Sequence, residues 1–421
     1  MKDRHFEAPR RAGVVYISAG RAYRSPVVNE CSIAGHWAGG FDEGAISQWA
    51  AGLRQQLRAP SVSLGLVFMT PRFFPHARQL LEILRLDARI PLLAGCSSQS
   101  LIAGGSEFED KAGFVLSLYH LPGAELTGFR FDQSQAAQWD GPGFWSAATG
   151  VERGATHGWL AFLDPFHMDS EGWLRSWNAS YAPLPVMGGL ASGDYHEQAT
   201  QVYLNGEVFE EGGVAISVGG AVRLSGITSQ GCTPIGETWT LTKVNRNIIH
   251  EIGNRPAYEV LTETYNALPA HAKAEAGRNI FIGLVVNEYL DEFHRGDFLI
   301  RNLLGADPRS GTIAVGALPR AGQTMQFQQR SAAAATEDLG ALLGGLKQRL
   351  GGAAVYGGCL CSCNGRGRNL FGELHHDARM VQEAFGPLGL SGFFCNGEIG
   401  PVGETNFLHG FTASLALFTK G

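Results

Sequence analysis

Residues 91–98 have the sequence PLLAGCSS, and this stretch is the clearest member of a pattern that recurs along the chain. It follows an apolar segment at 63–69 (SLGLVFM) and a segment with helical spacing at 77–86, and it precedes the apolar segment 114–119 (FVLSLY). Short apolar runs bounded by glycine, proline and small residues are typical of buried strands. The sequence therefore predicts a unit of strand, helix, strand, turn and strand.

The same unit recurs in the following hundred or so residues. A strand is predicted at 159–163, a helix at 170–178, and a further strand at 213–218 (GVAISV). Between them lies PVMGGLAS at 185–192. Aligning Gly95 with Gly189 also aligns Ser98 with Ser192, which indicates a duplicated module.

A third copy is predicted near the end of the chain, with a strand at 353–358, a helix at 377–385 and a closing strand at 412–418. The apolar segments 279–286 and 298–304 suggest a fourth copy. Repeats of about 90 residues indicate duplicated modules rather than a solenoid. We therefore expect an α/β fold in which duplicated modules form mixed or antiparallel sheets covered by helices.

The expected organisation has two domains after an N-terminal extension. The extension covers residues 1–45, the first domain covers 46–240 with two internal repeats, and the second covers 257–421.

Composition narrows the class of protein. Of the 421 residues, 44% are hydrophobic and 17% are charged, which is ordinary for a globular chain and excludes a disordered one. The formal net charge of −6 supplies no basic surface for a nucleic-acid backbone. We therefore expect no nucleic-acid partner.

The seven cysteines and the N-terminal sequence predict a cytoplasmic protein. An odd cysteine count in a large chain argues against a disulfide framework. The start, MKDRHFEAPRRAG, lacks the apolar core of a signal peptide, and no apolar run reaches the ~18 residues that span a bilayer. We expect no membrane insertion.

Four segments together resemble a known family. They are LLAGCSSQSLIAGGSEFED at 92–110, CNGRGRNLF at 363–371, GFFCNGEIG at 392–400 and LHGFT at 408–412. The chain resembles the FIST family (F-box and intracellular signal transduction) as a stand-alone, bacterial-type member. Its N-terminal half would cover about 45–240 and its C-terminal half 257–418.

The resemblance implies a sensory protein that binds a small ligand such as an amino acid. Because no kinase, F-box or other output region accompanies the two halves, a separate signalling partner would carry the signal. No cofactor is predicted, but some bacterial relatives are regarded as haem-binding sensors of nitric oxide. Haem, held by one of the 13 histidines, is therefore an alternative.

The glycine-rich turn at 363–367 supplies the first candidate binding residues. Arg366 offers a planar fork for the carboxylate of an amino acid or organic acid, and Asn364 offers a hydrogen bond. Glu398 would bind a ligand ammonium or orient Arg366. The alternative is a structural turn in which Arg366 pairs with Glu398. Cys363 belongs to the same turn.

Ser97, Ser98 and Asp194 follow equivalent strands and are expected to line a cleft between modules. His409 completes the candidate ligand-binding set. An enzyme that uses Cys363 as nucleophile, with His409 as its base, is one alternative. A protein-interaction scaffold is another. A metal site at Cys359, Cys361 and Cys363 would require the strand to bend, so no metal is predicted.

Overall fold

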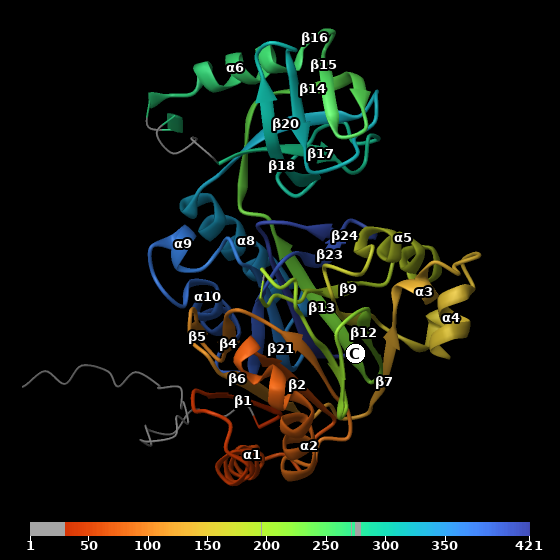
Figure 1. Ribbon diagram of the computed structural model, residues 1–421, viewed down its shortest axis with the longest axis vertical. Coiled ribbons are helices and arrows are strands. Elements are labelled where there is room, and N and C mark those ends of the chain that lie inside the picture. Colours follow the sequence, from red (N-terminus) through yellow and green to blue (C-terminus); the bar gives the residue numbers. More distant parts are fainter. Residues whose placement is uncertain (1–29, 195, 271, 274–278) are drawn as a thin grey trace, which may run out of the picture.

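The computed structural model describes residues 30–194, 196–270, 272–273 and 279–421. These residues form three six-stranded sheets and a small antiparallel barrel, which stands at one end of the molecule (Figure 1). The predicted α/β fold with mixed sheets is confirmed. Residues 1–29 of the predicted extension lie outside the described residues.

The first sheet is built from the module that contains PLLAGCSS. Its strands have the order β1-β6-β2-β3, in which β2 and β3 are parallel and the other neighbours are antiparallel. Helices α1 and α2 pack their apolar residues on the outer face of this sheet. The elements are β1 (Ser32–Trp37), α1 (Glu43–Gln56), β2 (Leu64–Met69), η1 (Pro71–His76), α2 (Ala77–Asp87), β3 (Leu93–Ser97) and β6 (Phe114–Tyr119).

The second sheet repeats this arrangement with the order β7-β12-β8-β9 and a parallel pair β8–β9. Helix α5 covers its outer face with a cluster rich in tryptophan. The elements are β7 (Ala124–Phe131), α3 (Gln133–Ala136), α4 (Phe144–Thr149), η2 (Arg153–Ala155), β8 (Trp159–Leu163), α5 (Ser170–Tyr181), β9 (Val186–Leu190) and β12 (Gly213–Gly220).

The third sheet has the order β13-β25-β21-β22, with β21 and β22 parallel and with α8 and α10 on its outer face. The three predicted copies of the module are therefore present. The elements are β13 (Val222–Ser229), α8 (Ala332–Leu350), β21 (Val355–Cys363), α9 (Arg368–Phe371), α10 (His376–Phe385), β22 (Leu390–Cys395) and β25 (Ala413–Lys420).

Each module sends a hairpin into the sheet of another module. The first module's hairpin pairs with β22 of the third, the third module's hairpin with β9 of the second, and the second module's hairpin with β3 of the first. The exchange is a closed cycle. The hairpins are β4 (Leu101–Ala103) with β5 (Ser106–Phe108), β10 (Val202–Leu204) with β11 (Glu207–Phe209), and β23 (Glu398–Val402) with β24 (Thr405–His409).

One apolar core lies between the inner faces of the three sheets, because its buried residues come from all of them. Three phenylalanine rings, one from β2, one from β8 and one from β22, meet there. The Phe68 centroid lies 5.3 Å from that of Phe162 and 4.7 Å from that of Phe393. The modules therefore share one interior.

Close strand approach at one equivalent position of each module requires glycine. A Cβ atom there would lie less than 2 Å from a carbonyl oxygen of the neighbouring parallel strand. Such a Cβ would lie 1.7 Å from Val67 O at Gly95, 1.9 Å from Ala161 O at Gly188 and 1.9 Å from Leu360 O at Gly392. The equivalent of Gly95 is thus Gly188, and the expected alignment with Gly189 is wrong by one residue.

The barrel occupies the chain between β13 and α8. Because β14 pairs with both β20 and β15, the ring of antiparallel strands closes. The expected fourth module is wrong, since its two apolar segments form the antiparallel neighbours β17 and β18 rather than a parallel pair. The elements are β14 (Cys232–Asn245), β15 (Ile248–Ile252), β16 (Arg255–Pro256), α6 (Ala257–Ala267), β17 (Ile280–Val285), β18 (Phe298–Asp307), β19 (Thr312–Val315) and β20 (Thr324–Arg330).

The domain boundaries at 46–240 and 257–421 remain a prediction. Strand β13 and the hairpin β4-β5, which precede residue 240, complete the third sheet together with strands from beyond 257. Strand β1, inside the predicted extension 1–45, forms an edge of the first sheet.

Replacing Gly188 with alanine should destabilise the protein by about 3 kcal/mol, because the added methyl would force β9 away from β8. Gly52, in α1, has open space around its Cα, so Gly52→Ala should be neutral or stabilising. Urea denaturation of the two variants measures the difference. Equal free energies of unfolding would contradict the close approach.

Candidate functional site

The three modules meet where β3, β9 and β22 end. Two serine hydroxyls donate to one carbonyl there: Ser98 Oγ lies 2.9 Å and Ser192 Oγ 2.6 Å from Phe394 O. Ser97 Oγ accepts the N–H of Gln201 at 3.0 Å. The predicted residues Ser97 and Ser98 are fully buried and tie modules together.

A cavity of about 530 Å³ opens beside this junction, and all three modules line it. Asn364 and Asp194 of the predicted set line it. The other six predicted residues do not: Ser97, Ser98, Cys363, Arg366, Glu398 and His409. The lining residues are Pro71, Gln99, Ser100, Glu109, Asp110, Gly193, Asp194, His196, Asn364, Asn369 and Phe394.

Three carboxylates give the cavity a negative lining, and none of the described residues that line it is lysine or arginine. Asp194 Oδ1 accepts the N–H groups of His196 and Glu197 at 2.8 and 3.0 Å, which fixes its side chain in a turn. Asp110 pairs with Arg368 at the surface, at 3.0 Å. The cavity therefore suits an ammonium group better than an anion.

Asn364 is held in the cavity wall by a chain of amide contacts. Its Nδ2 donates to Asn396 Oδ1 at 2.9 Å, and Asn396 Nδ2 donates to Ala191 O at 3.1 Å. The backbone N–H of Asn364 donates to Cys395 O at 3.1 Å. Asn396, which the sequence analysis does not propose, thus positions Asn364 and joins two modules.

Arg366 is fully buried, and its partner is Asp377 rather than Glu398. Its Nε and Nη2 donate to the two oxygens of Asp377 at 2.7 and 2.9 Å. Ser362 and His376 also donate to this carboxylate. Although burial opposes it, the charge of Arg366 holds the pKa of Asp377 below its usual range. Nε and Nη2 of the guanidinium are thus occupied by this pair, while Nη1 is buried without a hydrogen-bond partner among the described residues.

Glu398 is buried beneath the last strand. Its Oε2 accepts the N–H and the hydroxyl of Thr412 at 3.0 and 2.7 Å, and its Oε1 accepts the Cys395 thiol at 3.1 Å. Burial raises the pKa of Glu398 to about 7 despite these donors. Its contacts connect β23 to the start of β25.

Cys363 and His409 do not form a nucleophile and base pair. Burial, followed by the charge of Glu398, raises the pKa of Cys363 to about 12, so the reactive thiolate is disfavoured. His409 Nε2 donates to Gly400 O at 3.0 Å, and burial lowers its pKa to about 4. Cys359 and Cys361 lie in the shared apolar core.

Comparison with known families agrees with this architecture. The FIST N domain model matches residues 63–255, and the FIST C domain model matches residues 257–401. The chain belongs to the FIST family. FIST domains are in general small-ligand sensory domains of signal transduction.

Relatives of this FIST protein occur in mycobacteria. An uncharacterized protein of Mycobacterium tuberculosis H37Rv is 35% identical over 388 residues, which cover 89% of this chain and 96% of the relative. An uncharacterized protein of Mycobacterium bovis is 35% identical over 379 residues, covering 87% and 92%. Both relatives span nearly the whole FIST arrangement.

The described part of this FIST protein contains no helix with the length and apolar character needed to cross a bilayer. In the same residues, no group of three or more His, Cys, Asp or Glu side chains could hold a metal ion.

Arg366→Met should reduce the free energy of unfolding by about 3 to 5 kcal/mol, because it leaves the Asp377 carboxylate buried without its cation. Arg368 is a matched control: it is 56% exposed and pairs with Asp110 at the surface. Arg368→Met should cost less than about 1 kcal/mol. Chemical denaturation measures both. Similar small losses would contradict a structural role for Arg366.

Glu398 should make the protein less stable as the pH rises. Its pKa in the folded state is about 7, above the ordinary value of 4.5. The stabilisation is therefore present below about pH 4.5 and is lost as the pH rises through 7. Between about pH 5 and pH 8, the wild type should lose on the order of 3 kcal/mol relative to Glu398→Gln. Parallel pH dependences of the two proteins would refute this assignment.

Proposed function

We propose that this FIST protein is a sensor that binds a small polar ligand, an amino acid or organic acid, in the cavity at the strand-end turns. The observation that carries the proposal is the 530 Å³ cavity lined by all three modules. That volume lies in the range of small-molecule sites, about 300 to 1,000 Å³. The acidic lining favours an amino acid, whose ammonium would meet Asp194 and Glu109.

The turn at 363–367 offers a route from the cavity to the barrel. Asn364 lines the cavity, and the carbonyl of the next residue, Gly365, accepts Arg330 Nη1 at 3.2 Å. Arg330 ends β20 of the barrel, and its guanidinium lies 4.5 Å from the ring centroid of Phe411. A ligand that moves Asn364 would shift this contact, and a separate partner would detect the change.

We also propose that the protein works in the cytoplasm. Six of the seven cysteines, Cys96, Cys232, Cys359, Cys361, Cys363 and Cys395, form no disulfide within the described residues, which fits a reducing compartment. A ligand of cytoplasmic metabolism would then reach the cavity directly.

Calorimetric titration with amino acids and the corresponding 2-oxo acids tests the ligand class, because each pair differs only at the amino group. We expect binding of at least one amino acid and weaker binding of its 2-oxo acid. Asp194→Asn keeps the turn-forming acceptor but removes the charge, and should weaken binding about tenfold. Asn364→Ala should also weaken it.

Glu207→Gln is the matched control, since Glu207 is exposed on β11 and does not line this cavity. It should leave the affinity unchanged. Binding that survives in Asp194→Asn and Asn364→Ala would place the ligand elsewhere, and the absence of binding by any amino acid or organic acid would reject the proposal.

A further inference from the structure

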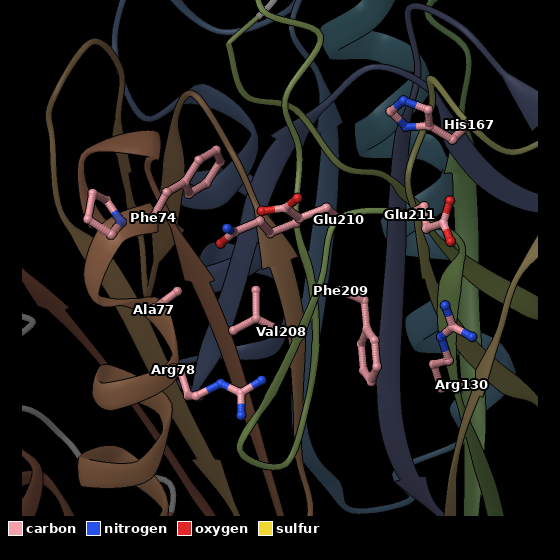
Figure 2. A pocket seen from close by; sticks show the side chains of 11 residues that line it. Phe74, Ala77, Arg78, Arg130, His167, Val208, Phe209, Glu210 and Glu211 are labelled. Carbon is pink, nitrogen blue, oxygen red and sulfur yellow. The ribbon is translucent and has the colours of Figure 1, made fainter.

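A second cavity, of about 730 Å³, lies between the first and second modules (Figure 2). On one side it is bounded by η1 and α2, which contribute Phe74 and Arg78. On the other side it is bounded by β11 and the chain that follows, which contribute Val208, Glu210 and Glu211. It shares no lining residue with the cavity of the proposed function.

The outer edge of each exchanged hairpin is a place where backbone groups need partners. All three hairpins have two-residue loops and the same register, so Glu107, Val208 and Asn406 each occupy the second position of the second strand. Residues at this position direct N–H and C=O away from the hairpin. As each strand is the edge of its sheet, these groups are not paired by another strand.

A neighbouring side chain satisfies the edge at two of these positions. The N–H of Glu107 donates to His375 Nδ1 at 2.8 Å. The N–H of Asn406 donates to Asn178 Oδ1 at 3.2 Å, and its carbonyl accepts from Asn178 Nδ2 at 2.8 Å. The side-chain amide of Asn178 therefore pairs with the backbone much as a peptide unit would.

Val208 differs from its two counterparts. Within the described residues, no side chain and no backbone group outside its hairpin bonds to the N–H or C=O of Val208. Gly188 is the counterpart of Gly95, and Asn178 lies ten residues before Gly188. The counterpart of Asn178 in the first module is therefore Arg85, ten residues before Gly95, and Arg85 forms no hydrogen bond with the backbone of Val208. Val208 is half-buried and is one of the residues that line the second cavity, so this hairpin edge without a side-chain partner lies beside that cavity.

Charges of both signs surround this edge. Arg78 projects from α2, and no described residue forms an ion pair with it. Arg130 stands on the opposite wall, 4.9 Å from the ring centroid of Phe209, and pairs with Asp132. Glu210 and Glu211 are exposed at the rim. The lining therefore complements a zwitterion.

We propose that this cavity is a binding site for a short peptide with free termini. Its amide would pair with the N–H and C=O of Val208, its carboxylate with Arg78, and its ammonium with Glu210 or Glu211. Phe74 and Phe209 would contact an apolar side chain. A single amino acid lacks the amide, and an organic anion lacks the ammonium.

Amide hydrogen exchange measured by NMR tests the premise. The backbone amide hydrogen of Val208 should exchange much faster than those of Glu107 and Asn406, because the N–H groups of these two residues are hydrogen-bonded. If the three amides were equally protected from exchange, the N–H of Val208 would have a hydrogen-bond partner after all. That result would overturn the proposal.

Titration with the tripeptides Ala-Leu-Ala and Ala-Phe-Ala tests the ligand class, with the Val208 amide resonance as the readout. Either tripeptide should shift this resonance and slow its exchange. Amidating the C-terminus, or Arg78→Ala, should each weaken binding about tenfold through loss of the charge pair. Arg58→Ala changes an exposed arginine in the loop after α1, and should have no effect.

The two proposals fail separately. Asp194→Asn should leave tripeptide binding unchanged, because Asp194 lines only the first cavity. Failure of both tripeptides to perturb Val208 at millimolar concentration would overturn the peptide site. Equal affinity for the free and the amidated peptides would overturn the assignment of Arg78.

Discussion

The exchange of hairpins is the constraint on which the molecule depends. Each parallel strand pair is extended by two strands that belong to another module, and the cycle closes after three steps. None of the three sheets is complete without another module. The shared interior, in which Phe68, Phe162 and Phe393 meet, has the same consequence. The modules are therefore expected to unfold together, with the barrel as the part least bound by the cycle.

The turn CNGRG serves more than one purpose. Arg366 faces inward and neutralises Asp377 at the start of α10, while Asn364 faces the cavity and Gly365 contacts the barrel. A buried ion pair adds little net stability over an apolar pair, but removing one partner is costly. The arginine thus fixes the shape of the turn, and Asn364 of the same turn lines the cavity.

Much of the fold could be predicted from sequence, because strands such as 114–119 are buried on both faces and stand out as apolar runs. The barrel could not be predicted, because Ile280–Val285 is equally apolar. No feature of the local sequence indicates whether this strand pairs with its neighbour in a parallel or an antiparallel way. Within the site, Asn364 and Asp194 were predicted from their places at strand ends. The pairing of Arg366 with Asp377 was missed because Asp377 lies in an ordinary amphipathic helix, without a motif around it.

The cavity at the junction of the three modules has a consequence for how such a site can diversify. A ring of three identical subunits would surround its axis with three copies of the same side chain. Here the three copies share one chain, so Gln99, Asp194 and Asn364 can differ around a single opening. Joining the three modules in one chain thus surrounds the cavity with an asymmetric wall, whereas a ring of identical subunits would give it three-fold symmetry.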